Sequence, residues 1–202
     1  MKHLIVRYNI VEMEDIMARE KEVTILNIDE NDFMNRLLNH GAVKKDEFLQ
    51  RRYTYDFNPV LPNKWIRLRT NGKKTTLTIK EIVDKTAIDG TGELETVVGD
   101  FDVMNDILKE LGYHYRNYQE NYRKIYTMDH VEISIDSWPL IPTYAEIEGS
   151  TTEEVIDALN KLGYTLADAT TLDVASIYKE IYGIDVLKIK ELKFEGSMSK
   201  QN

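Results

Sequence analysis

The residues of this sequence that could do chemistry begin with two acidic pairs of the same form. One is Glu20-x-Glu22 near the start of the chain, and the other is Glu146-x-Glu148 near residue 150. In a β-strand the side chains of residues i and i+2 point to the same face, so each pair sets two carboxylates side by side. If the two pairs meet in the fold, they concentrate negative charge that a hard cation or a cationic ligand would neutralise.

A basic pair of the same form, Arg67-x-Arg69, lies between the acidic pairs in the chain. In a strand it presents two guanidinium groups on one face. Arginine binds phosphate oxygens through paired hydrogen bonds, whereas carboxylates bind hard metal ions. Acidic pairs and a basic pair in one small domain rich in strands therefore indicate a metal-dependent phosphate site.

Composition limits the classes of function that remain. The net charge of −9 disfavours nucleic acid as a partner, because phosphate backbones require a basic surface. The sequence has no cysteine, which excludes disulfides, thiolate metal sites and a thiol nucleophile. No apolar run approaches the roughly 20 residues of a membrane-spanning helix. We therefore expect a cytoplasmic protein with neither a nucleic-acid nor a membrane partner.

Elements with the periodicity of strands make up most of the chain. They span residues 48–57, 64–70, 74–82, 92–98, 121–128, 131–138 and 143–149. A unit recurs three times, in which a strand carrying Glu-x-Glu precedes an amphipathic helix that ends at Gly41, Gly112 or Gly163. Asn71-Gly72 predicts a hairpin turn, and Asp129-His130 joins two further strands. The pattern indicates an α+β fold of mainly antiparallel strands with three or four helices.

The predicted strands alternate between a charged face and an apolar face. The apolar face requires cover from helices or other strands, while the polar face either meets water or lines the interior of a polar barrel. Single strands usually turn a polar face to water, but each strand here tends to carry one sign of charge at successive positions. This clustering favours the barrel. The polar set comprises Arg67, Arg69, Thr76, Thr78, Lys80, Glu93, Glu95, Arg123, Glu132, Ser134, Asp136, Glu146 and Glu148.

The chain divides into three parts by composition. Residues 1–16 fit the remainder poorly, and Met17 is a candidate natural start, so we expect an extension there. Residues 17–185 are expected to form a single domain, because no low-complexity linker divides them. Residues 186–202 form a mildly basic tail to which the sequence assigns no role.

Several strings resemble the CYTH domain, the triphosphate tunnel metalloenzyme superfamily of class IV adenylate cyclases, thiamine triphosphatases and inorganic triphosphatases. Residues 131–149 match its ending, with Asp136, a loop containing Pro139, and Glu146-Ile147-Glu148-Gly149. Residues 20–24 resemble its opening, 65–69 its Arg-x-Arg strand, and 78–81 its lysine strand. The resemblance implies an antiparallel eight-stranded closed β-barrel with flanking helices, whose polar interior binds a triphosphate and a divalent metal.

The resemblance also implies roles for the charged side chains. A Mg²⁺ or Mn²⁺ cofactor would bind Glu20, Glu22, Asp136, Glu146 and Glu148. The phosphates of a small-molecule triphosphate would bind Arg52, Arg67, Arg69, Lys80 and Arg123. Catalysis would fall to Glu148, Glu146 and Arg69. Glu95 has a ligand or a supporting role, and Trp65 either stacks on an organic ring or packs at a tunnel rim.

Two positions depart from the family pattern, because Thr24 and Asn121 stand where lysines are expected. The first hypothesis is metal-dependent hydrolysis of the terminal phosphate of inorganic triphosphate or a nucleoside triphosphate. The second is a class IV adenylate cyclase, which forms cyclic AMP and pyrophosphate. The third is a weakly catalytic protein that binds polyphosphate or a nucleotide, as two missing cations would favour. The sequence leaves the oligomeric state open, a homodimer being one option.

Overall fold

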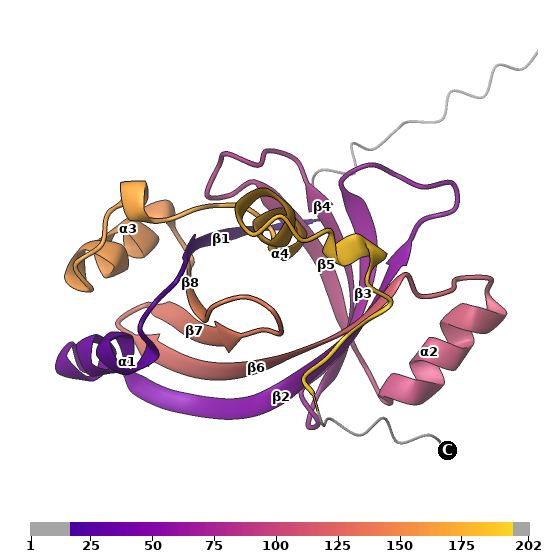
Figure 1. The fold of residues 1–202 in the computed structure, drawn as a ribbon, viewed down its shortest axis with the longest axis horizontal. Coiled ribbons are helices and arrows are strands. Elements are labelled where there is room, and N and C mark those ends of the chain that lie inside the picture. The colour runs from indigo at the N-terminus through magenta and orange to yellow at the C-terminus, as the bar shows by residue number, and fades with distance from the viewer. Residues whose placement is uncertain (1–16, 196–202) are drawn as a thin grey trace, which may run out of the picture.

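The computed structural model describes residues 17–195, which form a closed β-barrel flanked by helices (Figure 1). The barrel strands are β1 (Ala18–Ile25), β2 (Val43–Asp56), β3 (Lys64–Thr70), β4 (Thr75–Ile82), β5 (Thr91–Val98), β6 (Asn117–Met128), β7 (Val131–Ser137) and β8 (Tyr144–Gly149). They follow one another in the order β2-β3-β4-β5-β1-β8-β7-β6, and pairing of β2 with β6 closes the ring. The predicted antiparallel eight-stranded barrel is confirmed. The predicted extension, residues 1–16, lies outside the described residues.

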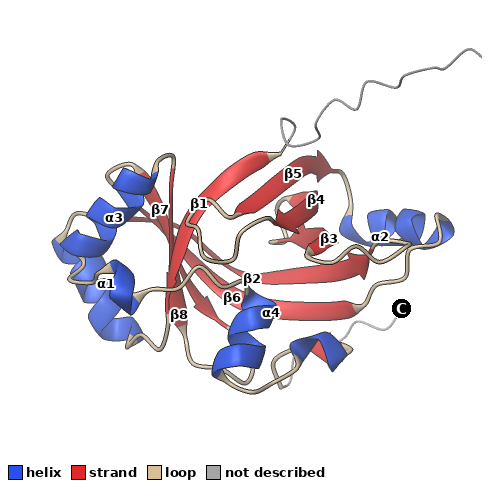
Figure 2. Ribbon diagram, turned by 90° about the horizontal axis from the view of Figure 1, so that it is seen from above, coloured by secondary structure: helices blue, strands red, loops and turns tan. Residues whose placement is uncertain are grey.

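Helices flank the barrel in separate places (Figure 2). They are α1 (Glu30–Asn39), α2 (Phe101–Glu110), α3 (Thr152–Lys161) and α4 (Val174–Ser176), which continues as a π-helical turn over Ile177–Ile181. α1 and α3 lie side by side, and the Arg36 guanidinium donates to the carbonyl of Leu162 at 3.0 Å. α2 packs on the far side, against β3. None of the helices between residues 17 and 195 is long and apolar enough to cross a membrane.

The apolar face of the strands supplies the core beneath these helices. Ile133 and Ile147 are fully buried in one cluster with Phe33 of α1 and Leu159 of α3. Burying a large aliphatic side chain contributes roughly 1.5–3 kcal/mol, so this outer layer supports the barrel. The apolar side chains thus pack outward, and the polar side chains of the same strands are left facing inward.

The three predicted helices end where their sequences indicate. Their N-caps are Asp29, Asp100 and Thr151, and each side-chain oxygen accepts a backbone N–H of the first turn. Just beyond their C-termini Gly41, Gly112 and Gly163 adopt φ values of +78°, +89° and +82°. Glycine adopts this left-handed conformation without a steric cost, which is why each helix stops there.

Two strands extend further than predicted, since β2 begins at Val43 and β6 at Asn117. Residues 44–47 are polar on both faces, and the pairing register shifts between Lys44 and Asp46, so alternation gives no signal there. The described part of the tail forms a 3₁₀ turn, Val186–Lys188, and a short strand, β9 (Glu191–Leu192), parallel to β6. A further 3₁₀ turn spans Leu166–Asp168.

Candidate active site

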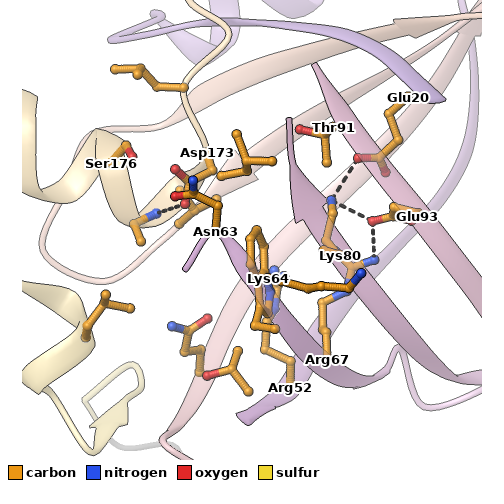
Figure 3. A pocket seen from close by; sticks show the side chains of 18 of the residues that line it. Glu20, Arg52, Asn63, Lys64, Arg67, Lys80, Thr91, Glu93, Asp173 and Ser176 are labelled. Carbon is orange, nitrogen blue, oxygen red and sulfur yellow. Dashed lines mark hydrogen bonds and ion pairs between the residues drawn. The ribbon is translucent and has the colours of Figure 1, made fainter. Parts of the chain in front are cut away.

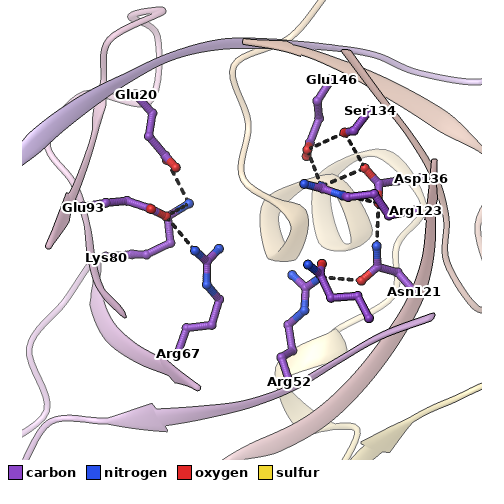
Figure 4. A network of polar contacts seen from close by, with 11 residues as sticks. Glu20, Arg52, Arg67, Lys80, Glu93, Asn121, Arg123, Ser134, Asp136 and Glu146 are labelled. Atoms are coloured by element: carbon purple, nitrogen blue, oxygen red, sulfur yellow. Dashed lines mark hydrogen bonds and ion pairs between the residues drawn. The ribbon is translucent and has the colours of Figure 1, made fainter. Parts of the chain in front are cut away.

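A cavity of about 680 Å³ occupies the barrel interior and has a wide mouth at one end. Most of the predicted site residues line it, namely Glu20, Glu22, Arg52, Arg67, Arg69, Lys80, Arg123, Glu146 and Glu148. Asp136 does not line it, because its fully buried side chain lies behind that of Arg123. Alternation along the strands therefore brings the predicted residues together in one tunnel, on opposite sides of its wall (Figure 4).

One side of the tunnel, built from β3, β4, β5 and β1, carries a chain of ion pairs (Figure 4). Lys80 Nζ lies 2.9 Å from Glu20 and 2.6 Å from Glu93, while Arg67 lies 2.9 Å from Glu93. Burial opposes the ionised form of Glu93, yet Arg67 and Lys80 hold its pKa at about 2. Burial raises the pKa of Glu20 to about 7 despite Lys80. Of these two carboxylates, Glu93 keeps its charge and Glu20 gives it up more readily.

Sequence reasoning did not assign Glu93 a role, although it belongs to the third Glu-x-Glu pair of the repeat. Its Cα lies opposite that of Lys80 across β4 and β5, and this register was the missing signal. Glu95, the other member of that pair, accepts from the Thr78 hydroxyl at 2.8 Å and lies 3.5 Å from Arg69. Both residues hold the cations of the tunnel in position.

On the opposite side, Arg123 binds two carboxylates. Its guanidinium lies 2.8 Å from Asp136 and 2.5 Å from Glu146, and Ser134 donates to Asp136 at 2.8 Å. Asn121, at a position where the family pattern has lysine, donates its amide N–H to Asp136 and accepts from Arg52. The amide thus connects an anion to a cation, which an ammonium group could not do.

Arg52 lies where positive charge is densest. Its guanidinium sits 4.5 Å from the centre of the Trp138 ring. Burial and the nearby guanidiniums of Arg67 and Arg69 lower the pKa of Arg52 to about 9. Burial and the same kind of repulsion lower the pKa of Arg69 to about 10. Such mutual repulsion between cations is relieved when an anion binds among them.

Three further carboxylates face the cavity without a cationic partner. The strand register sets Glu22 opposite Glu148, and Glu148 opposite Glu132, in a row across β1, β8 and β7. None of the three forms a hydrogen bond or ion pair with any residue from 17 to 195. Burial, followed by repulsion from Glu146 and Glu20, raises the pKa of Glu22 to about 8. Burial, then Glu132, raises the pKa of Glu148, whose side chain is exposed and lines the cavity.

The arrangement of these carboxylates determines how a divalent metal could bind. Within residues 17–195, no three histidine or acidic side chains already converge into a metal cage. Three of the five predicted ligands, Glu20, Asp136 and Glu146, are bound to cations. Mg²⁺ usually binds one or two carboxylates and completes its shell with water and substrate phosphates. Glu22 and Glu148 therefore fit a metal that arrives with a phosphate ligand.

The wide mouth of the tunnel is bordered by the β2–β3 loop and by the segment 171–187 (Figure 3). The Lys85 ammonium donates to Ser176 at 3.2 Å, and the Thr171 hydroxyl donates to the Lys85 carbonyl at 2.7 Å. Trp65 lines the cavity and is half-buried. Thr24, at the other position where lysine is expected, is buried and pairs through its backbone with Thr170. Sequence reasoning did not assign this segment to the site, because its packing is non-local.

Known proteins resemble this chain in both sequence and fold. The sequence profile of the CYTH domain matches residues 18–180, whereas no curated protein matches the chain. A conserved hypothetical protein from Pyrococcus furiosus is 23% identical with a TM-score of 0.67, covering 77% of this chain and 97% of that chain. A Vibrio parahaemolyticus protein provisionally named an adenylate cyclase is 17% identical with a TM-score of 0.68, covering 82% and 98%.

A third structure is a Hippeastrum protein, provisionally named an adenylyl cyclase and described as having a dominant triphosphatase activity. It is 14% identical with a TM-score of 0.52, covering 81% of this chain and 96% of that chain. At these identities the likeness to solved structures establishes the shared fold. Since the profile matches residues 18–180, which include every strand of the barrel, this chain belongs to the CYTH domain family.

Proposed function

We propose that the protein hydrolyses the terminal phosphoanhydride bond of a triphosphate, either inorganic or carried by a nucleoside, with Mg²⁺ or Mn²⁺ as cofactor. One observation carries the proposal: the tunnel wall is divided between two kinds of charge. Glu22, Glu132 and Glu148 form a row without cationic partners in the described chain. The opposing cations are Arg52, Arg67, Arg69, Lys80 and Arg123. A triphosphate would satisfy the cations, and its metal would satisfy the carboxylates.

Binding requires the cations to exchange partners. In the structure Lys80 and Arg123 are bound to carboxylates of the tunnel itself. Phosphate oxygens accept the same charge-assisted hydrogen bonds, so the exchange replaces one strong contact with another. Arg52 and Arg69, whose pKa values are lowered by burial and mutual repulsion, gain most from an anion.

Hydrolysis of the terminal phosphate needs positioning and neutralisation of charge rather than covalent catalysis. When bound, the metal supplies positive charge to the phosphate oxygens and lowers the pKa of a coordinated water. Glu148 and Glu22 would hold the metal, joined by Glu146 once Arg123 exchanges that carboxylate for phosphate, and Arg69 would neutralise oxygens of the group being transferred. A new bond joins the water oxygen to the terminal phosphorus, the bond to the bridging oxygen breaks, and a proton is released with orthophosphate and the diphosphate.

The neighbour from Hippeastrum supports hydrolysis over cyclisation, since a dominant triphosphatase activity is described for a protein of the same fold. Cyclisation also demands that a ribose hydroxyl be held in line with the α-phosphorus. The contacts in the tunnel are made by charged groups suited to phosphate and metal.

Chromatography of the products formed from ATP and from tripolyphosphate, with Mg²⁺ and separately with Mn²⁺, tests the proposal. We expect ADP with orthophosphate from ATP, and pyrophosphate with orthophosphate from tripolyphosphate. Cyclic AMP with pyrophosphate would replace the proposal with a cyclase. Tight binding without products under either metal would make the protein a triphosphate-binding relative.

A further inference from the structure

The tunnel has a second, narrower opening at the end away from the segment 171–187. A cavity of about 140 Å³ lies there, lined by Phe48, Gln50, Arg69, Asn71, Lys74, Thr76, Glu95, Arg123, Ile125 and Glu132. Four of these residues, Arg69, Glu95, Arg123 and Glu132, also line the main cavity. The two cavities therefore adjoin at these side chains, and the barrel can be approached from both ends.

The narrow cavity offers donors for an anion. Thr76 is 4% exposed, and its hydroxyl oxygen has no hydrogen-bond partner among the described residues. It lies on the inner face of β4, directly opposite Arg69 of β3. The ammonium of Lys74, at the same end, forms no hydrogen bond or ion pair with residues 17–195. A buried hydroxyl, an unpaired ammonium and a guanidinium together are a donor set for phosphate oxygens.

The two carboxylates of the narrow cavity affect this donor set differently. Glu95 is already bound by Arg69 and by the Thr78 hydroxyl, so its charge is compensated. Glu132 has no cationic partner in the described chain and lies where the two cavities meet. Its charge repels a phosphate held in the narrow cavity, so the phosphate is bound weakly there and is readily released.

Size distinguishes the two openings. The narrow cavity, at about 140 Å³, is small and suits a small ion such as a single tetrahedral phosphate. The main cavity, at about 680 Å³, has the size of cavities that hold whole organic ligands. The wide mouth has room for the organic group of an organic triphosphate, and a triphosphate bound that way points its terminal phosphate toward the narrow end.

We infer that the narrow opening is the exit for orthophosphate, bound on its way out by Arg69, Lys74 and Thr76, while the diphosphate leaves through the wide mouth. The inference rests on the proposed function, since it assigns a route to the product of that reaction. It separates the two products in space, so orthophosphate can bind and leave while the diphosphate still occupies the wide mouth.

Calorimetric titration of inorganic phosphate tests the site without turnover. Phosphate is titrated into the protein alone and into the protein with excess ADP, for the wild type, Lys74→Ala and Thr76→Val. Lys73→Ala is the matched control, because its neighbouring ammonium is bound to Asp46 at 2.9 Å outside the tunnel. We expect phosphate to bind the wild type with or without ADP. Its affinity should be about tenfold lower in Lys74→Ala and in Thr76→Val, because each loses one charge-assisted contact. Its affinity for Lys73→Ala should equal that for the wild type. Equal affinity in Lys74→Ala and Lys73→Ala would overturn the inference, as would loss of phosphate binding when ADP is present.

A plug at the opening provides the second test. Ile125→Trp, at a half-buried residue that lines the narrow cavity and supplies no donor to phosphate, should retain single-turnover hydrolysis of ATP but release orthophosphate more slowly, as followed with a fluorescent phosphate-binding reporter. Release at the wild-type rate would contradict the exit. If the wild type hydrolyses neither ATP nor tripolyphosphate, the proposed function fails, and the phosphate titration still decides whether the narrow opening is an anion site.

Discussion

At the scale of single residues, charge in the tunnel is organised by which groups lack a partner. Lys80 and Arg123 each bind two carboxylates. In the described chain, Glu22 and Glu148 form no ion pair with a cation. Unpaired like charges held together are costly, and they are kept in proteins where a ligand neutralises them. Substitutions at the unpaired residues are therefore the most direct tests of the site.

Replacing Glu22 with glutamine tests the acidic row. We expect Glu22→Gln to lose turnover of ATP at saturating Mg²⁺ or Mn²⁺, because an amide is a poor ligand for a hard cation. Near wild-type turnover would exclude Glu22 from the metal site. Glu110→Gln, an exposed change at the end of α2, is the control and should keep wild-type turnover.

The same residue makes stability depend on pH. The pKa of Glu22 is about 8 in the folded protein and about 4.5 when unfolded, so the folded state holds more protons between these values. The free energy of unfolding of the metal-free protein should then fall as pH rises from about 5 to about 8, and it should fall less in Glu22→Gln. Denaturant unfolding at about pH 5 and pH 8 measures both slopes. Equal slopes for the two proteins would contradict the shift.

Asn121 provides a stability test at the same scale. Its side chain is fully buried and connects Asp136 to Arg52. Asn121→Leu leaves both charged groups without this contact, which should cost about 1–3 kcal/mol in the free energy of unfolding. Asn39→Leu, exposed at the end of α1, is the control. An equal effect of the two substitutions in urea unfolding would mean that the amide has no bridging role.

At the scale of elements, the ends of helices are determined locally. Thr151 accepts from the Glu154 N–H at 3.2 Å, and the Glu154 carboxylate accepts from the Thr151 N–H at 3.0 Å. This capping box begins α3, which covers the outer face of β8 and β1. The helix in turn keeps the acidic strands of the tunnel packed.

Thr151→Ala should lower the free energy of unfolding by about 1 kcal/mol, because it leaves a first-turn N–H without its acceptor. Ser150→Ala is the neighbouring control, since the Ser150 side chain forms no hydrogen bond in the described structure. Thermal unfolding of both variants measures the difference. If Ser150→Ala lowers the free energy of unfolding as much as Thr151→Ala does, Thr151 is not the residue that caps α3.

At the scale of the whole molecule, a barrel lined with charge is stabilised by its ligand. Cations that repel one another, such as Arg52 and Arg69, raise the energy of the folded state until an anion binds. Any ligand that binds only the folded chain stabilises it in proportion to its affinity and concentration. The stability of this protein should therefore depend on triphosphate.

Tripolyphosphate with Mg²⁺ at a hundred times its Kd should raise the free energy of unfolding by about 2.7 kcal/mol. Inorganic sulfate at equal ionic strength is the control, and it should give a smaller shift because it engages fewer of the cations. The measurement is the melting temperature against ligand concentration. Equal shifts with sulfate would indicate general ionic stabilisation rather than binding in the tunnel.

The sequence by itself determined the faces of the strands and the ends of the helices. Arg67-x-Arg69 and Glu146-x-Glu148 point inward because alternation is a property of the extended backbone, and Gly163 ends α3 because of its own conformational freedom. The resemblance to a family added the closure of the strands into a barrel. These features are local, or follow from the resemblance to the family.

Only the tertiary structure decided which charges pair and which remain free. That Glu93 binds Lys80 and Arg67, that Glu22 stands beside Glu148, and that the segment 171–187 borders the wide mouth all follow from strand register and packing. From the sequence, the acidic residues of these strands cannot be told apart, since each occupies an inward position of an alternating strand. Their environments differ because the barrel brings together residues distant in the chain, and burial with particular neighbours sets the charge of each one.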